Sequence, residues 1–130
     1  MKLLFAATVA VACITSTTHA QDAVAGATVF KKCMSCHAVG EGAKNKVGPE
    51  LNGVIGRPVA SISGYNYSAA MKGSGLTWDE ATLIEFLKGP KALVPGTKMA
   101  FAGLKTDADI ANVVAYLKQF AADSSGTPAP

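Results

Sequence analysis

The segment Cys33-Met34-Ser35-Cys36-His37 decides how the rest of this 130-residue sequence is interpreted. Two thiols at this spacing can add to the two vinyl groups on one edge of a porphyrin, and His37 then lies beneath the iron as an axial ligand. The pattern C-x-x-C-H is therefore typical of covalent c-type haem attachment. We predict one haem c per chain, attached through Cys33 and Cys36 and ligated by His37.

Three other interpretations of the segment explain less of it. A Cys33–Cys36 disulfide would leave His37 unexplained. A thioredoxin-like redox pair needs a strand–helix–strand context, and no strand is expected before Cys33. A structural zinc site needs about four Cys or His ligands. Of the 3 Cys and 2 His in the sequence, one of each precedes residue 21, so only these three would remain after removal of the N-terminal segment.

The first 20 residues have the pattern of a cleaved secretory signal peptide. Met1-Lys2 is a basic start, and the apolar run Leu3 to Ile14 is shorter than the ~20 residues that span a bilayer as a helix. Thr18-His19-Ala20 resembles a small-x-small cleavage site. We predict cleavage after Ala20 and export to the periplasm, where haem is attached in bacteria. An uncleaved membrane anchor is the main alternative.

Apolar periodicity predicts a small all-α domain over residues 21–122. Helices are expected at Asp22–Lys32, from Thr77 to Lys88, and from about Thr106 to Ala122, with a shorter one at Ser68–Lys72. Long loops separate them, so the core is thin and haem would complete it. Residues 123–130 lack apolar anchors and are expected to form a disordered tail.

Local signals refine these helices. Thr77 and Glu80 match the T-x-x-E capping box, and Gly89-Pro90 should end the same helix. Gly26 lies inside the first predicted helix, where a glycine costs up to ~1 kcal/mol relative to alanine. Its expected use is the close approach of another backbone.

The second axial position decides between functions, and no second His remains to fill it. An open position would favour gas binding or peroxide chemistry, whereas a Met thioether would favour electron transfer. Met34 lies within the attachment segment and cannot reach the opposite face. Met99 lies in a turn-rich loop and Met71 on a short helix. Because loops on rigid scaffolds commonly deliver ligands, Met99 is favoured, with Met71 as the alternative.

With these residues in place, the sequence resembles the class I cytochromes c, in particular the bacterial cytochrome c2 type close to mitochondrial cytochrome c. The resemblance runs from about Asp22 to Phe120. Beyond the attachment motif it includes Gly26, Phe30, Lys46-Val47-Gly48-Pro49, Gly56-Arg57, Gly64-Tyr65-Asn66-Tyr67, Leu76-Thr77-Trp78, the segment Pro95 to Gly103, and Val114 to Leu117.

The resemblance implies the class I cytochrome c fold around one covalently bound haem, with Met99 as the second axial ligand. It implies that the Pro49 carbonyl accepts a hydrogen bond from the His37 ring. Gly26 and Phe30 would pack against Val113 and Tyr116. Four further residues would hold or neutralise the haem propionates: Arg57, Tyr67, Trp78 and Thr97.

Two positions depart from relatives close to the mitochondrial form. Those relatives often have Tyr where this chain has Phe86, and Asn where it has Met71. Both changes remove a polar group near the predicted Met ligand. We expect a drier distal pocket with an altered potential.

The resemblance also implies the function of a one-electron carrier that has no small-molecule substrate and is not an enzyme. It would take electrons from a membrane cytochrome bc complex. It would pass them to a terminal oxidase, a photosynthetic reaction centre or another reductase. It is expected to act as a monomer.

Charge suits transient docking to such membrane complexes. The net charge of +3, from 12 Lys+Arg and 9 Asp+Glu, is too weak to suggest nucleic-acid binding. Local charge is more informative, since Lys88 to Lys105 contains four Lys and no acid. We predict a docking patch for acidic partners, with an ordinary solvated basic face as the alternative. The patch would comprise Lys31, Lys32, Lys91, Lys98 and Lys105.

Overall fold

The computed structural model describes residues 21–120; the predicted signal peptide and the tail at 123–130 lie outside this range. The described part contains the helices α1 (Ala23–Phe30), α2 (Ala69–Lys72), α3 (Glu80–Lys88), α4 (Pro90–Leu93) and α5 (Asp107–Lys118). Its only β-type pairing is an isolated antiparallel bridge between Pro58 and Thr77. The all-α prediction is confirmed, with one short helix more than expected.

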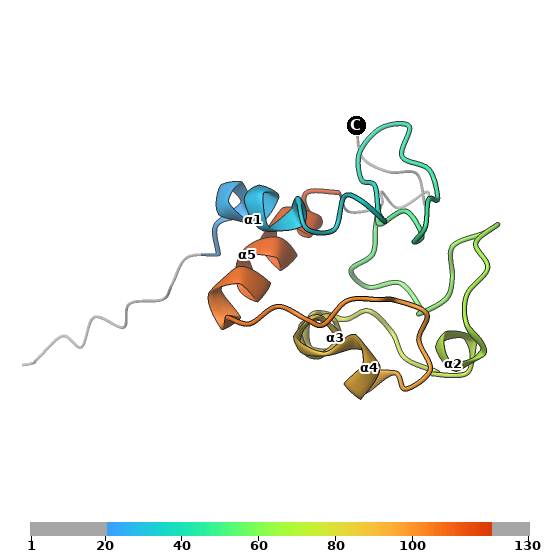
Figure 1. The fold of residues 1–130 in the computed structure, drawn as a ribbon. Helices are drawn as coiled ribbons and strands as arrows, with labels where there is room; N and C mark the ends of the chain where they lie inside the picture. The colour runs from blue at the N-terminus through green and yellow to red at the C-terminus, as the bar shows by residue number, and fades with distance from the viewer. Residues whose placement is uncertain (1–20, 121–130) are drawn as a thin grey trace, which may run out of the picture.

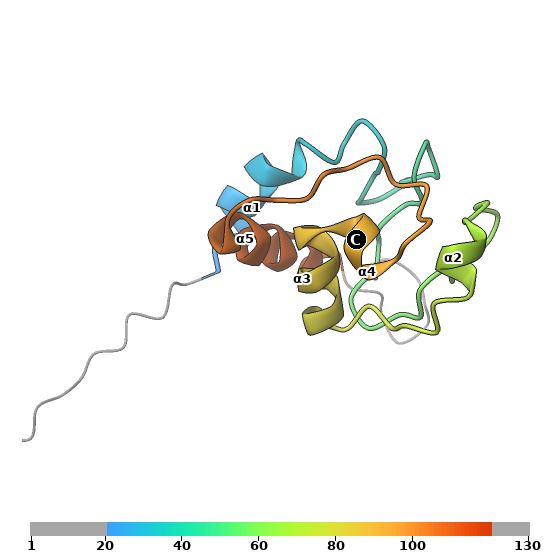
Figure 2. The ribbon, with the colours of Figure 1, turned by 60° about the horizontal axis from the view of Figure 1, so that its bottom comes forward.

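The first and last of these helices pack side by side in both views (Figures 1 and 2). A Cβ atom on Gly26 would lie 2.6 Å from the Asn112 carbonyl carbon and 2.8 Å from the Tyr116 Cβ, too close for any larger residue. The Phe30 and Tyr116 rings are 5.3 Å apart. The predicted use of Gly26, close approach of a second backbone, is confirmed.

The predicted start of α1 is confirmed, but its predicted end is wrong. Asp22 is the N-cap, and its carboxylate accepts hydrogen bonds from the Val24 and Ala25 N–H groups. The helix ends at Phe30 rather than Lys32 because the next residues form tight turns. Their N–H groups bond three or four positions back, as in Cys33 N–H to the Phe30 carbonyl at 2.8 Å. The attachment segment therefore leaves the helix as a compact series of turns.

The predicted capping box of α3 is wrong. The N-cap is Asp79, whose carboxylate accepts from the Thr82 N–H at 2.8 Å. Thr77 instead lies in an extended segment paired with Pro58, and the adjoining Trp78 N–H donates to the Arg57 carbonyl. This long-range pairing prevents Thr77 from acting as the cap.

One other helix end differs from the prediction, and one that was predicted correctly also begins an unexpected helix. Gly89-Pro90 ends α3, as expected, but Pro90 is also the first residue of α4, a position that proline favours. Helix α5 begins after the N-cap Thr106 and ends at Lys118, before the expected end at Ala122. Beyond it, the Phe120 N–H bonds to the Leu117 carbonyl three positions back, and the Phe120 ring packs on Tyr116 at 5.1 Å.

The hydrophobic core joins α1, α3 and α5 to the loops that follow them. Val113, Val114 and Ile110 of α5 are almost fully buried, and Leu83, Phe86 and Leu87 contribute the buried face of α3. Cys33, Met71 and Met99 pack against this core while only partly buried. None of the helices within residues 21–120 has the length and apolar character to cross a membrane.

Candidate haem-binding site

One cavity of about 470 Å³ lies beside the core, within the size range of cofactor sites. Much of its wall is apolar, with Leu51, Val54, Leu83, Phe101 and Leu117 among the lining residues. Its lining also includes all nine residues predicted to bind the cofactor: Cys33, Cys36, His37, Pro49, Arg57, Tyr67, Trp78, Thr97 and Met99. Residues from distant parts of the sequence thus meet at a single site.

The attachment segment presents two free thiols to this cavity. Cys33 and Cys36 are partly buried and form no disulfide. The turn between them is closed by hydrogen bonds from Cys36 and His37 N–H to the Cys33 carbonyl, at 3.1 and 2.8 Å. Burial, and then the neighbouring Cys36, raise the pKa of the Cys33 thiol, while Lys32 partly opposes the rise. Two thiols and an imidazole on one short turn fit covalent haem attachment.

The His37 ring is held in a defined orientation. Its Nδ1 lies 2.7 Å from the Pro49 carbonyl oxygen, which can only accept, so Nδ1 carries the proton and Nε2 keeps its lone pair. Burial is the main cause that lowers the pKa of His37, and the hydrogen bond to Pro49 opposes it. A neutral imidazole with a free Nε2 is the form that binds iron.

Gly48 is part of this arrangement. A Cβ atom at Gly48 would come within 2.8 Å of His37 Nδ1, so only glycine allows the backbone to lie against the ring. The Gly48 N–H also donates to the Cys36 carbonyl at 2.8 Å. In the sequence, Gly48 stands out only as part of the longer motif Lys46-Val47-Gly48-Pro49. The signal for its role was a Gly-Pro pair in a loop that follows a candidate metal ligand.

Both candidate methionines line the cavity. Met99 follows a turn in which Gly96 has φ of +92° and the Thr97 N–H bonds to the Val94 carbonyl. The Met99 N–H then donates to the Thr97 hydroxyl at 3.3 Å. Met71 lies in α2, which the Ser68 hydroxyl caps by accepting from the Met71 N–H at 3.0 Å. Phe86, the other apolar departure, is buried in the same wall.

The polar residues of the cavity are engaged with the backbone. Arg57 donates to the carbonyls of Asn52 and Glu50 at 2.7 and 3.1 Å, and the Glu50 carboxylate lies 3.9 Å from its guanidinium. Burial lowers the pKa of Arg57, whereas Glu50 and then Tyr67 raise it. The Tyr67 hydroxyl accepts from the Ile62 N–H at 3.1 Å. Two of the five Arg57 donors are used here, so others remain for a ligand.

Other polar residues near the site were missed by the sequence analysis. Asn52 is buried, and its side-chain amide bonds to both the N–H and the carbonyl of Gly40, at 2.8 and 2.9 Å. The Glu50 carboxylate accepts from the Asn52 N–H at 2.7 Å. These contacts cross between loops, where no periodic pattern marks them in the sequence.

The structure brings only some of the predicted docking lysines to the cavity. Lys32 and Lys98 line it, whereas Lys31, Lys91 and Lys105 do not. The Lys32 ammonium lies 3.9 Å from the Asp109 carboxylate, and both side chains are well exposed. An exposed ion pair of this kind contributes at most ~1 kcal/mol, so Lys32 can leave Asp109 readily.

Comparison with known proteins agrees with this geometry. The cytochrome c family model matches residues 23–121. The chain is 58% identical to cytochrome c-550 of Bradyrhizobium diazoefficiens, over 78% of this chain and 74% of that one. It is 54% identical to cytochrome c2 of Blastochloris viridis, over 82% and 84%. The solved cytochrome cH from Methylobacterium extorquens superposes with a TM-score of 0.71 at 46% identity, covering 75% of this chain and 97% of that one. The chain belongs to the cytochrome c family, and within it to the bacterial cytochrome c2 type.

Proposed function

We propose that the protein is a periplasmic one-electron carrier whose haem is attached at Cys33 and Cys36 and whose iron is ligated by His37 and Met99. Its family membership makes it an electron carrier rather than an enzyme, with one covalently bound haem c per chain. The observation that carries the proposal is that all four residues line one cavity, although Met99 comes from a distant segment.

The residues around the cavity suit a site that exchanges electrons without exchanging ligands. The bound haem supplies the ferric–ferrous couple. The Pro49 carbonyl fixes the His37 tautomer, so that Nε2 remains the ligand atom in both oxidation states. A thioether ligand from Met99 stabilises the reduced state and raises the potential. The apolar wall around Phe86 excludes water and strengthens these effects.

The assignment of Met99 over Met71 rests on two arguments. Met99 follows a turn fixed by two hydrogen bonds at Thr97, and it lies in the family-like segment Pro95 to Gly103. Met71 is within the short helix α2, and its N–H donates to the Ser68 hydroxyl that caps this helix. The variants Met99→Leu and Met71→Leu separate the two assignments, since only loss of the true ligand makes the iron high-spin.

Arg57, Tyr67, Trp78 and Thr97 are proposed to face the haem propionates. Arg57 supplies the cation, and its spare N–H donors can reach a carboxylate while the Asn52 and Glu50 carbonyls hold its orientation. Trp78 is buried and packs edge-on against Phe86 at 4.8 Å, which fixes its indole beside the cavity. A fixed cation near two carboxylates reduces the cost of burying their charge.

Docking is proposed to use five lysines, namely Lys31, Lys32, Lys91, Lys98 and Lys105. The support is that Lys32 and Lys98 line the cavity itself, so positive charge lies beside the proposed haem. The expected partners are membrane complexes: a cytochrome bc complex as donor, and an oxidase, a photosynthetic reaction centre or another reductase as acceptor. Contacts between a monomeric carrier and these complexes would be brief and salt-dependent.

The visible spectrum of the protein isolated from periplasm tests the proposal. We expect sharp low-spin c-type bands on reduction, a weak red band from the Met–ferric iron bond on oxidation, and no change when CO is added to the reduced form. High-spin bands or rapid CO binding in the native protein would show that Met99 is not a firm ligand. Determining the N-terminus of the same protein tests cleavage after Ala20, which should leave Gln21 as the first residue.

A further inference from the structure

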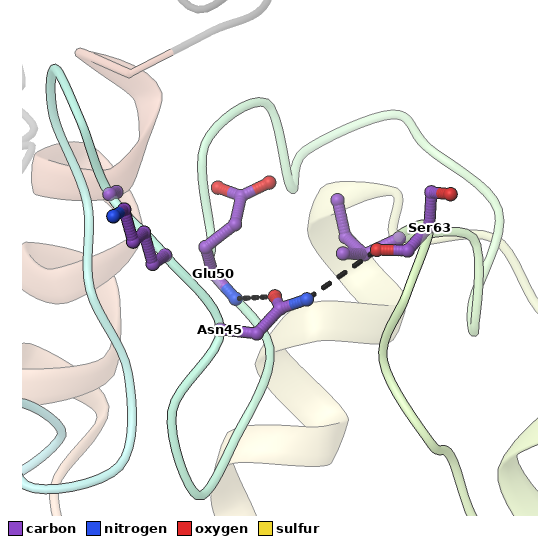
Figure 3. A pocket seen from close by; sticks show the side chains of 6 residues that line it. Asn45, Glu50 and Ser63 are labelled. Carbon is purple, nitrogen blue, oxygen red and sulfur yellow. Dashed lines mark hydrogen bonds between the residues drawn. The ribbon is translucent and has the colours of Figure 1, made fainter.

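A shallow cavity of about 440 Å³ lies outside the haem-binding site, and Asn45 spans it. Figure 3 shows the Asn45 amide between the Glu50 backbone and Ser63. Its Oδ1 accepts from the Glu50 N–H at 2.9 Å, and its Nδ2 donates to the Ser63 carbonyl at 3.5 Å. If the amide were flipped, its Nδ2 donor would face the Glu50 N–H, which is also a donor. The two hydrogen bonds therefore fix the orientation of the amide.

The Glu50 N–H that Asn45 binds belongs to the same peptide group as the Pro49 carbonyl. That peptide is trans and planar, so its N–H and C=O point in opposite directions. One end donates to Asn45 Oδ1 at 2.9 Å, and the other accepts from His37 Nδ1 at 2.7 Å. Asn45, one peptide group and the imidazole therefore form a continuous chain of two hydrogen bonds.

The surroundings hold this peptide in place. The Glu50 carbonyl accepts from Arg57 at 3.1 Å, and the Glu50 carboxylate binds the Asn52 N–H. On the other side, Gly48 lies against the His37 ring. The Pro49–Glu50 peptide can therefore not rotate away from either hydrogen-bonding partner without breaking several contacts.

We propose that Asn45 is a positioning residue for His37 and lowers the reduction potential through the Pro49–Glu50 peptide. This inference rests on the proposed role of His37 as axial ligand. Successive hydrogen bonds polarise one another by roughly 10–30% per bond, so the contact with Asn45 makes the Pro49 carbonyl a stronger acceptor. A stronger acceptor makes the imidazole more basic, and a more basic ligand favours ferric iron.

The test uses haem-loaded protein whose wild-type spectrum has first shown ligation by His and Met. In Asn45→Ala we expect the reduction equilibrium constant to rise about threefold, which is about 28 mV at 59 mV per tenfold change for one electron. In the reduced, diamagnetic protein the His37 Nδ1–H proton resonance should move upfield, because its hydrogen bond is weaker.

Two further variants distinguish polarisation of the Pro49–Glu50 peptide from the general effect of holding the two loops together. Asn45→Asp keeps the acceptor for the Glu50 N–H but loses the donor to Ser63, so the His37 resonance should stay at or downfield of its wild-type position. Tyr65→Phe is the matched control. It removes another bond between the same loops, from the Tyr65 hydroxyl to the Val47 carbonyl at 2.6 Å, and it should leave the His37 resonance unchanged.

The inference is overturned if Asn45→Ala keeps the wild-type potential and resonance, or if Tyr65→Phe moves both as far as Asn45→Ala does. If Asn45→Ala does not accumulate, Asn45→Asp decides: an upfield shift of the His37 proton refutes the inference, and an unchanged position or a downfield shift supports it. A wild-type spectrum without His37 ligation would instead defeat the proposed function, so the two failures are distinguishable.

Discussion

Replacing Gly26 by Ala should destabilise the protein, although alanine is the better helix former. The new Cβ would lie 2.6 Å from the Asn112 carbonyl carbon and 2.8 Å from the Tyr116 Cβ, where ordinary contacts are 3.4 to 4 Å. Both obstacles belong to or adjoin the α5 backbone, so neither can swing aside as a long side chain would. The two helices must separate, which disturbs the Phe30–Tyr116 contact and the bond from the Asp22 N–H to Asn112 at 2.9 Å.

The magnitude follows from two opposing effects. Overpacking costs typically 1–3 kcal/mol, and the rigid obstacles favour the upper end, while the helix propensity of alanine returns up to about 1 kcal/mol. The net loss is about 2 kcal/mol, or roughly 10 °C in the midpoint of thermal unfolding for a domain of this size. Circular dichroism of the haem-loaded protein measures it.

Gly89→Ala is the matched control for this measurement. Gly89 has φ of −167°, which any residue adopts, and a Cβ there would meet its nearest atom at 3.4 Å. We expect its midpoint to stay close to that of the wild type. An unchanged or raised midpoint for Gly26→Ala would refute the inference that the α1 and α5 backbones touch at this residue.

Three further predictions concern other parts of the structure. Arg57→Gln removes the guanidinium that binds the carbonyls of Asn52 and Glu50, so the free energy of unfolding should fall by about 3 kcal/mol. The reduction potential should also fall, because a cation near the haem is lost. Denaturant titration and voltammetry measure these two quantities, and if both stayed at their wild-type values, the roles given to Arg57 would be refuted. Phe86→Tyr introduces a hydroxyl into a buried apolar wall, so the potential and the pH of the alkaline transition should shift; an unchanged value of both would count against the dry distal pocket. The Lys118 ammonium, 2.7 Å away, lowers the pKa of Glu80, so this ion pair stabilises the fold above the ordinary carboxyl pKa of about 4.3 and the effect is lost as the pH falls through the lower folded value. Thermal midpoints from pH 7 to pH 3 should therefore drop less steeply for Glu80→Gln, and parallel curves would contradict this.

Short-range chemistry is what the sequence predicts best. The attachment motif is readable because covalent bonding to one porphyrin edge requires a fixed local spacing of Cys33, Cys36 and His37. Helices α1, α3 and α5 are readable because their buried faces repeat every three to four residues. Gly26 was informative because glycine lowers the stability of a helix. Its presence there indicated a compensating close contact with another backbone.

Contacts between distant loops are what the sequence did not predict. Thr77 had the right residue type and spacing for a cap, but its extended pairing with Pro58 placed the cap at Asp79. Gly48 can lie against the His37 ring because it has no side chain, and the Asn45 amide oxygen accepts a hydrogen bond from the backbone N–H of Glu50. Such contacts depend on which loops meet in space, and the local pattern of residues carries no information about that.

The packing of α1 against α5 also bears on how the protein is made. Residue 26 meets residue 112, so the domain cannot close until nearly the whole chain has been synthesised. The attachment segment directly follows α1, so it is synthesised before α5 and, in the proposed export, would also be translocated before it. Under the proposed export, Cys33 and Cys36 would therefore be accessible on an open chain during translocation, and haem could be joined to them before the final helix completes the core.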